Sequence, residues 1–371
     1  MGDRMDQKIR VAVLFGGKSG EHAVSLQSAA SVIQAMDPEK MDVFPVLINP
    51  EGKWQPGEYA LPALEGKMEP KLLEELGKRS TARDPLPVTT SLPVLKWEEI
   101  DVVFPVLHGT FGEDGTIQGM LEIADIPYVG AGVLASAVGM DKVMMKKIFA
   151  QEGLPQGDFT FCLRRAIEQD IDTVISGIEA EFAYPCFVKP ANLGSSVGIS
   201  KAKNREELKG ALQLAARYDR KVIVEEFIDA REVEVAVLGN EEPVASVPGE
   251  IVSSNDFYDY RAKYIDGKSE MRIPADLPEP VLEEISGLAL KAYQGIDCSG
   301  LARVDFFIRK SDGKILINEI NTMPGFTPFS MYANLWKHSG ISYPELISRL
   351  IDLALERHGE KKKSITTFDV E

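Results

Sequence analysis

Apolar and polar residues alternate along the first third of the chain in a pattern that switches between the strand period and the helix period. Residues 9 to 15 are almost continuously apolar, which predicts a buried strand, and GGKSGEH follows as a turn. Small and apolar residues then recur at helical spacing from Ser25 to Met36. Two further strands are predicted at MDVFPVLI and IDVVFPVLHG, and a further helix at GTIQGMLEIADI. Strands that alternate with helices predict a mostly parallel βαβ sheet.

One segment breaks this pattern. Residues 49 to 93 are charged and punctuated by proline and glycine. We interpret them as a variable insertion or as a lid over one edge of the sheet.

Two more units follow. The second begins near Met140 and predicts the elements MDKVMMKKIFAQEG (helix), YPCFVKP (strand), REELKGALQLAARY (helix) and KVIVEEFI (strand). The third predicts the strand EVEVAVLG, a polar segment from Pro248 to Pro274, the helix PVLEEISGLALKAYQGI, the hairpin LARVDFFIRKSDGKILINEIN and the helix YPELISRLIDLALERHG. We therefore expect an α/β protein, α+β in its central and C-terminal parts, with three domains at residues 1–139, 140–228 and 229–371.

Composition narrows the class of protein. A chain of 371 residues with 44% hydrophobic and 26% charged residues is an ordinary globular protein, too long for a single core. The net charge of -16 argues against a nucleic-acid partner and an anionic membrane surface. An anionic substrate would need basic residues gathered in a cleft. The charged N-terminus leads into an apolar run too short for a signal peptide or a membrane span, so we expect a cytoplasmic protein.

Two glycine-rich segments resemble nucleotide-binding motifs and fail them. GGKSG at residues 16 to 20 would complete a phosphate-binding P-loop only with glycine at position 12, which is Ala12. Gly130-Ala131-Gly132 with Ala135 imitates a dinucleotide fingerprint but lacks a clear βαβ unit around it. Neither segment supports a nucleotide site by itself.

The hairpin near the C-terminus carries a stronger chemical signal. Side chains two residues apart share one face of a strand, as Arg303 and Asp305 do on the first strand and Glu319 and Asn321 on the second. A three-residue loop, with Gly313 in the left-handed conformation, makes the facing pairs Lys310 with Lys314, Asp305 with Glu319, and Arg303 with Asn321.

Two facing carboxylates repel unless a cation lies between them. With the Asn321 carbonyl the donors are all oxygens, which suits Mg²⁺ bridged to phosphate oxygens. A solvated face with accidental acids is the alternative, and a two-residue loop would break the facing geometry.

Two further segments fit a nucleotide beside such a metal. In FVKPANLGSSVGIS a strand ends at Lys189, and a loop of small donors follows at Gly194, Ser195 and Ser196. Backbone N–H groups, hydroxyls and a lysine suit phosphate oxygens, although an ordinary strand-to-helix loop looks the same in isolation. EEFI at 225 to 228, with Glu232 beyond it, is a weaker indication of an adenosine site.

Together these segments resemble the ATP-grasp fold, and most of all the D-alanine–D-alanine ligase family. The matching segments stand in the family order and spread from about residue 10 to 355: LFGGKSGEHAVSL, PVLHGTFGEDGTIQGMLE, KPANLGSSVGISK, FYDYRAKY and NEINTMPGFTPFS. The resemblance implies a three-domain ATP-grasp enzyme that joins two D-alanines for peptidoglycan precursor synthesis.

The resemblance also implies site residues. The amino-acid substrates would be held by Glu21, His108, Ser330 and Met331. ATP would be held by Lys142, Lys189, Ser195, Ser196, Glu225, Phe227, Ile228, Glu232 and Lys263. The catalytic positions would be Glu21, Ser195, Tyr264, Arg303 and Gly325, of which Arg303 and the Gly325 N–H stabilise an oxyanion. The metal ligands would be Asp305, Glu319 and Asn321, in agreement with the hairpin geometry.

The implied partners are D-alanine, ATP and Mg²⁺, for which Mn²⁺ can substitute, with two metal ions in the site. A homodimer is expected from the family, and no nucleic acid or membrane. The first D-alanine is phosphorylated to an acyl phosphate, which the second D-alanine attacks through its amine. Because water would hydrolyse the acyl phosphate, we expect residues 248 to 274, with Lys263, to close over it.

Three other functions remain open from the sequence. A D-alanine–D-lactate ligase would make an ester, and Tyr264 favours the dipeptide over it, since ester-forming relatives carry other residues there. A different ATP-grasp carboxylate–amine ligase is the second. An inactive ATP-binding regulator is the third, and the presence of both metal acids and Arg303 disfavours it.

Overall fold

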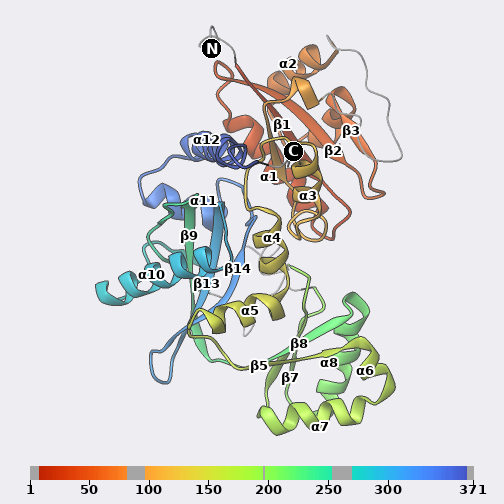
Figure 1. The fold of residues 1–371 in the computed structure, drawn as a ribbon, viewed down its shortest axis with the longest axis vertical. Coiled ribbons are helices and arrows are strands. Elements are labelled where there is room, and N and C mark those ends of the chain that lie inside the picture. The colour runs from red at the N-terminus through yellow and green to blue at the C-terminus, as the bar shows by residue number, and fades with distance from the viewer. Residues whose placement is uncertain (1–7, 82–96, 195–196, 253–269, 366–371) are drawn as a thin grey trace, which may run out of the picture.

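The computed structural model describes residues 8–81, 97–194, 197–252 and 270–365. In this part of the chain three sheets follow one another in sequence order. In Figure 1 the first sheet lies at the top, the second at the bottom and the third between them. The α/β class with a parallel N-terminal sheet is confirmed.

The first sheet has the strand order β3-β2-β1-β4. Its strands are β1 (Ile9–Gly16), β2 (Met41–Ile48), β3 (Trp54–Pro56) and β4 (Val102–Val106). β1 pairs in parallel with β2 and with β4, as the alternation of strands and helices predicts. The helices predicted beside it are α1 (His22–Ala35) and α3 (Thr116–Ile123). A short 3₁₀ helix, η2 (Trp97–Glu99), precedes β4.

The segment interpreted as an insertion holds regular structure. β3 pairs antiparallel with β2 at the edge of the sheet, and η1 (Gly57–Leu64) and α2 (Pro70–Thr81) follow it. Ala60, Leu64 and Leu76 are buried in the same core as β1. This segment therefore extends the first core, and residues 82–96 lie outside the described residues.

The second sheet is antiparallel, with the order β5-β8-β6-β7. Its strands are β5 (Phe159–Leu163), β6 (Cys186–Pro190), β7 (Ser200–Ala202) and β8 (Lys221–Glu226), and its helices are α6 (Arg164–Gln169), α7 (Ile171–Glu181) and α8 (Arg205–Tyr218). α8 has the bounds that its pattern predicts. It begins there because the Asn204 side chain accepts from the Glu207 N–H at 3.0 Å, and it buries Leu208 and Leu212.

The third sheet has the order β12-β11-β9-β13-β14, with β10 beside β9. Its strands are β9 (Ala230–Gly239), β10 (Val244–Ala245), β11 (Gly249–Val252), β12 (Glu270–Arg272), β13 (Gly300–Arg309) and β14 (Ile315–Asn321). The helices packed on it include α4 (Val133–Met140), α5 (Lys142–Gln151) and α10 (Glu279–Gly295). The C-terminal helices are α11 (Met331–His338) and α12 (Tyr343–Lys361).

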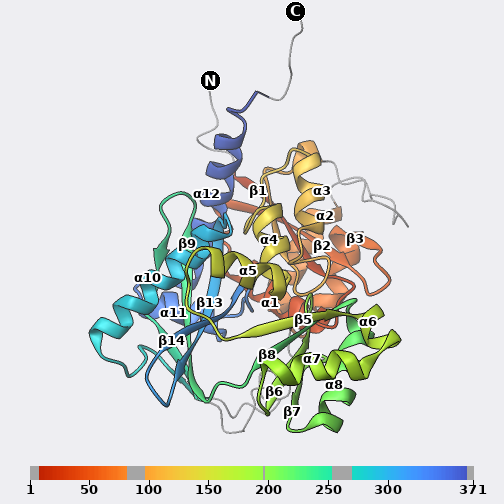
Figure 2. The ribbon, with the colours of Figure 1, turned by 60° about the horizontal axis from the view of Figure 1, so that its bottom comes forward.

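Two helices pack on a sheet other than the one that their place in the sequence suggests, or on more than one sheet. Met145 and Phe149 of α5 are buried in the core of the third sheet, although α5 precedes the second sheet in the chain (Figure 2). Leu346 and Leu350 of α12 are buried in a core that the first sheet shares with β9 and β13 of the third sheet. The domain bounds 1–139, 140–228 and 229–371 stay a prediction. Among the described residues, no helix has both the length and the apolar character that crossing a membrane requires.

The hairpin β13–β14 confirms two of the three predicted facing pairs and corrects the loop. Asp305 faces Glu319 and Arg303 faces Asn321. The pairing of Lys310 with Lys314 is wrong, because the Arg309 N–H donates to the Lys314 carbonyl at 3.0 Å and the loop is one residue longer. A β-bulge compensates: the register shifts between Asp305 and Phe306, which leaves Asn318 as the extra residue. Gly313 has a φ of 73°, the left-handed conformation that was predicted.

Candidate active site

A cavity of about 1180 Å³ lies between the sheets. Every predicted site residue that the structure describes lines it, namely Glu21, His108, Lys142, Lys189, Glu225, Phe227, Ile228, Glu232, Arg303, Asp305, Glu319, Asn321, Gly325, Ser330 and Met331. Ser195, Ser196, Lys263 and Tyr264 lie outside the described residues. Side chains from distant parts of the sequence therefore converge on one cavity.

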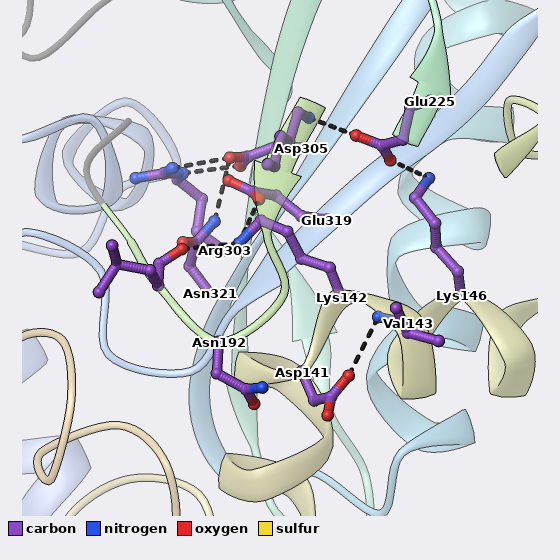
Figure 3. A network of polar contacts seen from close by, with 12 residues as sticks. Asp141, Lys142, Val143, Lys146, Asn192, Glu225, Arg303, Asp305, Glu319 and Asn321 are labelled. Atoms are coloured by element: carbon purple, nitrogen blue, oxygen red, sulfur yellow. Dashed lines mark hydrogen bonds and ion pairs between the residues drawn. The ribbon is translucent and has the colours of Figure 1, made fainter. Parts of the chain in front are cut away.

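Arg303 is the centre of a buried charge network in this cavity (Figure 3). Its guanidinium donates to both carboxylate oxygens of Asp305 at 2.7 Å and lies 2.8 Å from Glu234 Oε2. Asn321 Nδ2 donates to Asp305 Oδ2 at 3.0 Å. Burial acts to lower the pKa of Arg303, but the two carboxylates more than offset it and raise that pKa well above its ordinary value. Arg303 is thus a fixed cation within reach of the cavity.

Asp305, Glu319 and Asn321 have the donor chemistry of a magnesium site. Among the described residues, no three His, Cys, Asp or Glu side chains form a ready metal cluster. Two facing carboxylates and an amide oxygen leave the remaining ligand positions to water and phosphate oxygens, which is how Mg²⁺ is commonly held beside nucleotides. The residues therefore fit Mg²⁺ in the presence of a polyphosphate.

Lys142 links this network to the loop that follows β6. Its Nζ donates to the Leu193 carbonyl at 3.0 Å and lies 3.5 Å from Glu319 Oε2. Its backbone N–H donates to the Ala191 carbonyl at 3.0 Å. Asp141 caps the helix by accepting from the N–H groups of the next turn. Lys142 is therefore held at the first residue of α5, beside one carboxylate of the candidate magnesium site.

Glu225 lies between two lysines, one of which the sequence analysis missed. Its carboxylate is 2.5 Å from Lys189 Nζ and 2.9 Å from Lys146 Nζ. Burial would raise the pKa of Glu225, but the two ammonium groups lower it strongly. Burial likewise opposes the charge of Lys189, yet Glu225 and Glu319 raise its pKa. Lys146 was detectable, since it stands four residues after Lys142 on the same helix face.

Aromatic rings gather at the far end of β8. The rings of Phe227 and Phe187 have centroids 6.2 Å apart, and Lys201 Nζ lies 3.7 Å from the centroid of Phe227. Ile228, between β8 and β9, and Glu232, on β9, also line the cavity. A flat heteroaromatic ring suits this surface. Lys201 was also missed, because a lone lysine after a glycine-rich loop carries no sequence signal.

Glu21 and His108 lie at the other end of the cavity. Glu21 Oε2 would be 2.8 Å from a Cβ atom at Gly109, whose φ of 76° also favours glycine, and 3.1 Å from one at Gly194, so the backbone approaches this carboxylate closely at both glycines. His108 Nδ1 lies 3.1 Å from the Met323 carbonyl and its Nε2 3.1 Å from Ser28 Oγ.

Glu113, which the sequence analysis missed, lies beside this histidine at 3.6 Å from Nδ1. Burial raises the pKa of Glu113 to about 7, and the charge of Glu21 adds to the effect. Burial acts to lower the pKa of His108, but the nearby Glu113 and Glu21 raise that pKa above its ordinary value. This end of the cavity is negatively charged, which suits an ammonium group.

The start of α11 also lines the cavity. Ser330 is its N-cap residue, and its Oγ accepts from the Thr327 N–H at 3.0 Å. A Cβ atom at Gly325 would lie 3.3 Å from Ser330 Oγ, so a glycine lets the two segments approach. The N-terminus of a helix attracts carboxylates and phosphates. Ser330 and Met331 therefore lie where a substrate carboxylate would be favoured.

The expected concentration of basic residues is only partly present. Lysines and arginines do line the cavity, but Lys142, Lys146, Lys189 and Arg303 each lie against an acid. An incoming polyphosphate must therefore compete with carboxylates for these cations.

The chain is similar to known ligases over nearly its whole length. Two family models match, described as D-ala D-ala ligase N-terminus over residues 10–131 and D-ala D-ala ligase C-terminus over residues 148–352. The chain is 53% identical to the D-alanine–D-alanine ligase of Acetivibrio thermocellus over 97% of this chain and 99% of that one. It is 54% identical to the corresponding ligase of Geobacillus kaustophilus over 98% and 99%.

Solved structures agree with this similarity. The D-alanine–D-alanine ligase of Coxiella burnetii superposes with a TM-score of 0.81 at 36% identity, covering 96% of both chains. A D-Ala:D-Ser ligase of Enterococcus faecalis superposes with a TM-score of 0.78 at 36% identity, covering 94% of this chain and 100% of that one.

Proposed function

This chain belongs to the D-alanine–D-alanine ligase family, and we propose that it joins two molecules of D-alanine into D-alanyl-D-alanine with ATP, for peptidoglycan precursor synthesis. One observation supports this function best. A single cavity combines an acidic end, a pair of facing carboxylates with a buried arginine, a lysine-lined loop and a helix N-terminus. These are the groups that an amino acid and a nucleoside triphosphate require.

The first step forms an acyl phosphate. The carboxylate oxygen of the first D-alanine attacks the γ-phosphorus of ATP, and the bond from that phosphorus to the β-phosphate bridging oxygen breaks, releasing ADP. Glu21 binds the ammonium group of this D-alanine beside His108. Lys142, Lys189 and the loop residues Ser195 and Ser196 hold the phosphates. Mg²⁺, held by Asp305, Glu319 and Asn321, would neutralise charge on the phosphate oxygens.

The second step forms the peptide bond. The amine of the second D-alanine attacks the carbonyl carbon, a proton is released, and phosphate leaves with the oxygen that it took from the first substrate. The Arg303 guanidinium and the Gly325 N–H stabilise the negative charge on the carbonyl oxygen. Ser330, Met331 and the N-terminus of α11 hold the carboxylate of the second D-alanine.

Water must be kept from the acyl phosphate, and we assign this task to residues 248 to 274. Lys263 and Tyr264, both in this segment, lie outside the described residues. Its two described flanks, β11 and β12, pair antiparallel at the edge of the third sheet. A Cβ atom at Gly249 would lie 2.8 Å from Leu335 and 3.2 Å from Met331 Sδ, so β11 packs closely on α11. The flanks therefore reach the site of the second substrate. Because its proposed substrates are ATP and D-alanine, we infer that the reaction takes place in the cytoplasm.

Product identification tests this function. Purified protein is incubated with D-alanine, ATP and Mg²⁺, and the products are weighed by mass spectrometry. We expect D-alanyl-D-alanine, ADP and phosphate in equal amounts, and no ATP loss without D-alanine. ATP consumption that does not respond to D-alanine would indicate the inactive regulator or another substrate.

The identity of the second substrate depends on Tyr264. We expect wild type to make mainly dipeptide from D-alanine, even with D-lactate or D-serine present. Tyr264→Phe removes a phenol that in this family bonds to the residues matching Ser195 and Glu21. We predict that it raises ester formation relative to dipeptide, most clearly at low pH, where the competing amine is protonated. Competition at several pH values, read by mass spectrometry, measures the ratio. An ester as the main wild-type product at neutral pH would identify a depsipeptide ligase.

A homodimer is our proposal for the assembly, and exposed apolar side chains on three consecutive helices are the contacts that we propose for it. Phe111, Ile123, Leu134 and Met144 are exposed on or beside the consecutive helices α3, α4 and α5. Ile123 is 90% exposed. Contiguous apolar patches on a globular protein mark interaction surfaces, and we propose that these side chains contribute to one. We predict that Leu134→Glu shifts the protein from dimer to monomer in analytical ultracentrifugation. Val244→Glu, an exposed site on β10, is the matched control and should leave the dimer intact.

A further inference from the structure

We propose that Lys146 is a positioning residue for nucleotide binding, which keeps the Glu225 carboxylate paired when Lys189 turns to the phosphates of ATP. This inference rests on the proposed function, because it takes ATP as the ligand. It adds a residue that neither the family resemblance nor the sequence pattern assigned.

The three side chains form a compact buried group. The Glu225 carboxylate on β8 lies 2.5 Å from Nζ of Lys189 on β6 and 2.9 Å from Nζ of Lys146 on α5. The Lys146 residue is only 3% exposed and Glu225 7%. All three line the cavity. The group therefore contains two cations and one anion, and its net charge is positive.

Two phenylalanines, one on each strand next to β8, lie beside the two lysines. Glu225 pairs with Phe159 of β5 on one side and with Phe187 of β6 on the other. Lys146 Nζ lies 5.7 Å from the Phe159 ring centroid, and Lys189 Nζ 5.9 Å from that of Phe187. Each ammonium group thus has a ring face and one carboxylate as neighbours. The two lysines occupy equivalent places on either side of Glu225.

Their freedom to move differs. Lys146 follows Met145 on α5. Met145 and Phe149 are both buried in the core of the third sheet, so this helix is anchored on either side of Lys146. Lys189 stands next to the last residue of β6, directly before the loop that we assign to phosphate binding. It also lies within the electrostatic influence of Glu319 at the metal hairpin. Lys146 is therefore the fixed partner of Glu225, and Lys189 the one that can turn to a phosphate.

This difference in mobility explains why two lysines, rather than one, lie beside Glu225. If Lys189 were the sole partner of Glu225, a phosphate could bind it only by leaving a carboxylate buried without a cation, which is strongly unfavourable. With Lys146 present, Glu225 keeps a counterion in both states. The pairing with Lys146 therefore lowers the cost of transferring Lys189 to the nucleotide.

The test compares two ligands in calorimetric titrations of the full chain: ADP with Mg²⁺, and adenosine. Lys146→Met leaves a neutral Lys189–Glu225 pair, so the fold should persist. The loss of one charged hydrogen bond should weaken ADP binding by about tenfold or more. Adenosine, which has no phosphate, should bind as it does to wild type. Lys146→Arg should restore ADP binding. If the methionine variant does not fold, Lys146→Gln, which still donates to Glu225 but carries no charge, takes its place.

A double variant separates this role from a structural one. In the Lys146→Met background, Glu225→Gln removes the carboxylate that holds Lys189 and should recover much of the ADP affinity. In wild type, where Lys146 already pairs with Glu225, the same Glu225→Gln change should tighten ADP binding much less than it does in the Lys146→Met background. Unchanged ADP affinity in Lys146→Met, equal weakening of ADP and adenosine, or no recovery in the double variant would each overturn the inference. Wild type that binds no ADP would instead contradict the proposed function.

Discussion

Glu319→Gln should lower the rate of dipeptide formation by about two to four orders of magnitude while the fold stays intact. Glu319 faces Asp305 across the bulged hairpin, and the two carboxylates with Asn321 are the donors proposed for Mg²⁺. Glutamine keeps the size of the side chain and removes its charge. It therefore weakens the metal site, and because the lost repulsion from Asp305 offsets the lost attraction to Lys142, the fold should persist.

The tip of the same hairpin supplies the matched control. Asp312→Asn removes a carboxylate that is exposed and bonded to Arg309, outside the cavity. Its activity should stay close to that of wild type. Steady-state rates across a range of Mg²⁺ concentrations measure both variants. Near-normal turnover of Glu319→Gln at ordinary Mg²⁺ would rule out the metal assignment.

Arg303→Lys should lower kcat by about a hundredfold to a thousandfold, the usual effect of losing one donor to an oxyanion. Lysine keeps the positive charge, but it cannot donate to both oxygens of Asp305 and reach Glu234 at the same time. Arg303→Met should also destabilise the protein by about 3–5 kcal/mol, since it leaves two buried carboxylates without their cation. Rates and thermal unfolding curves separate the two effects.

Arg309 provides the comparison on the same strand. It donates to both oxygens of Asp312, at 2.9 and 2.7 Å, but at an exposed site. Arg309→Lys should change stability by less than about 0.5 kcal/mol and leave kcat unchanged. A kcat in Arg303→Lys within a few-fold of wild type would show that the guanidinium does not stabilise the oxyanion.

The same hairpin shows how far the sequence could predict the site. The alternation of side chains predicted that Asp305 faces Glu319, and this pairing is confirmed. The predicted loop was one residue too short, and the prediction contained no bulge. These two errors cancel, because the bulge at Asn318 shifts the register back by one residue. Bulges follow from sheet twist and packing rather than from local pattern, so the sequence alone could not locate this one.

Elements with strong periodicity were predicted well, and those held by tertiary contacts were not. α8 and β2 have the bounds that their patterns predict. α6 and α7 were missed, since α6 is short and charged and α7 has only two buried residues, Ile175 and Ile178. The sequence also did not predict that α5 packs on the third sheet, because residues far away in the sequence decide which sheet a helix packs on.

The predicted site residues depended on two sources of different strength. The metal hairpin followed from side-chain geometry, whereas Glu21 and His108 depended on the family resemblance. Glu113 and Lys201 were missed because each is a common charged residue whose burial or partner becomes visible only in three dimensions, whereas the spacing of Lys146 from Lys142 was a signal that was overlooked. Residues that position other site residues are the ones that a sequence motif least reveals.

An oxygen-labelling experiment tests the central claim, that the first D-alanine is activated as an acyl phosphate. D-alanine carrying ¹⁸O in its carboxylate is incubated with the protein, ATP and Mg²⁺, and the released phosphate and nucleotide are weighed by mass spectrometry. Because phosphate leaves with the oxygen that attacked ATP, each dipeptide should release one phosphate with a single ¹⁸O, and the ADP should be unlabelled. Unlabelled phosphate, or label in AMP, would contradict the account.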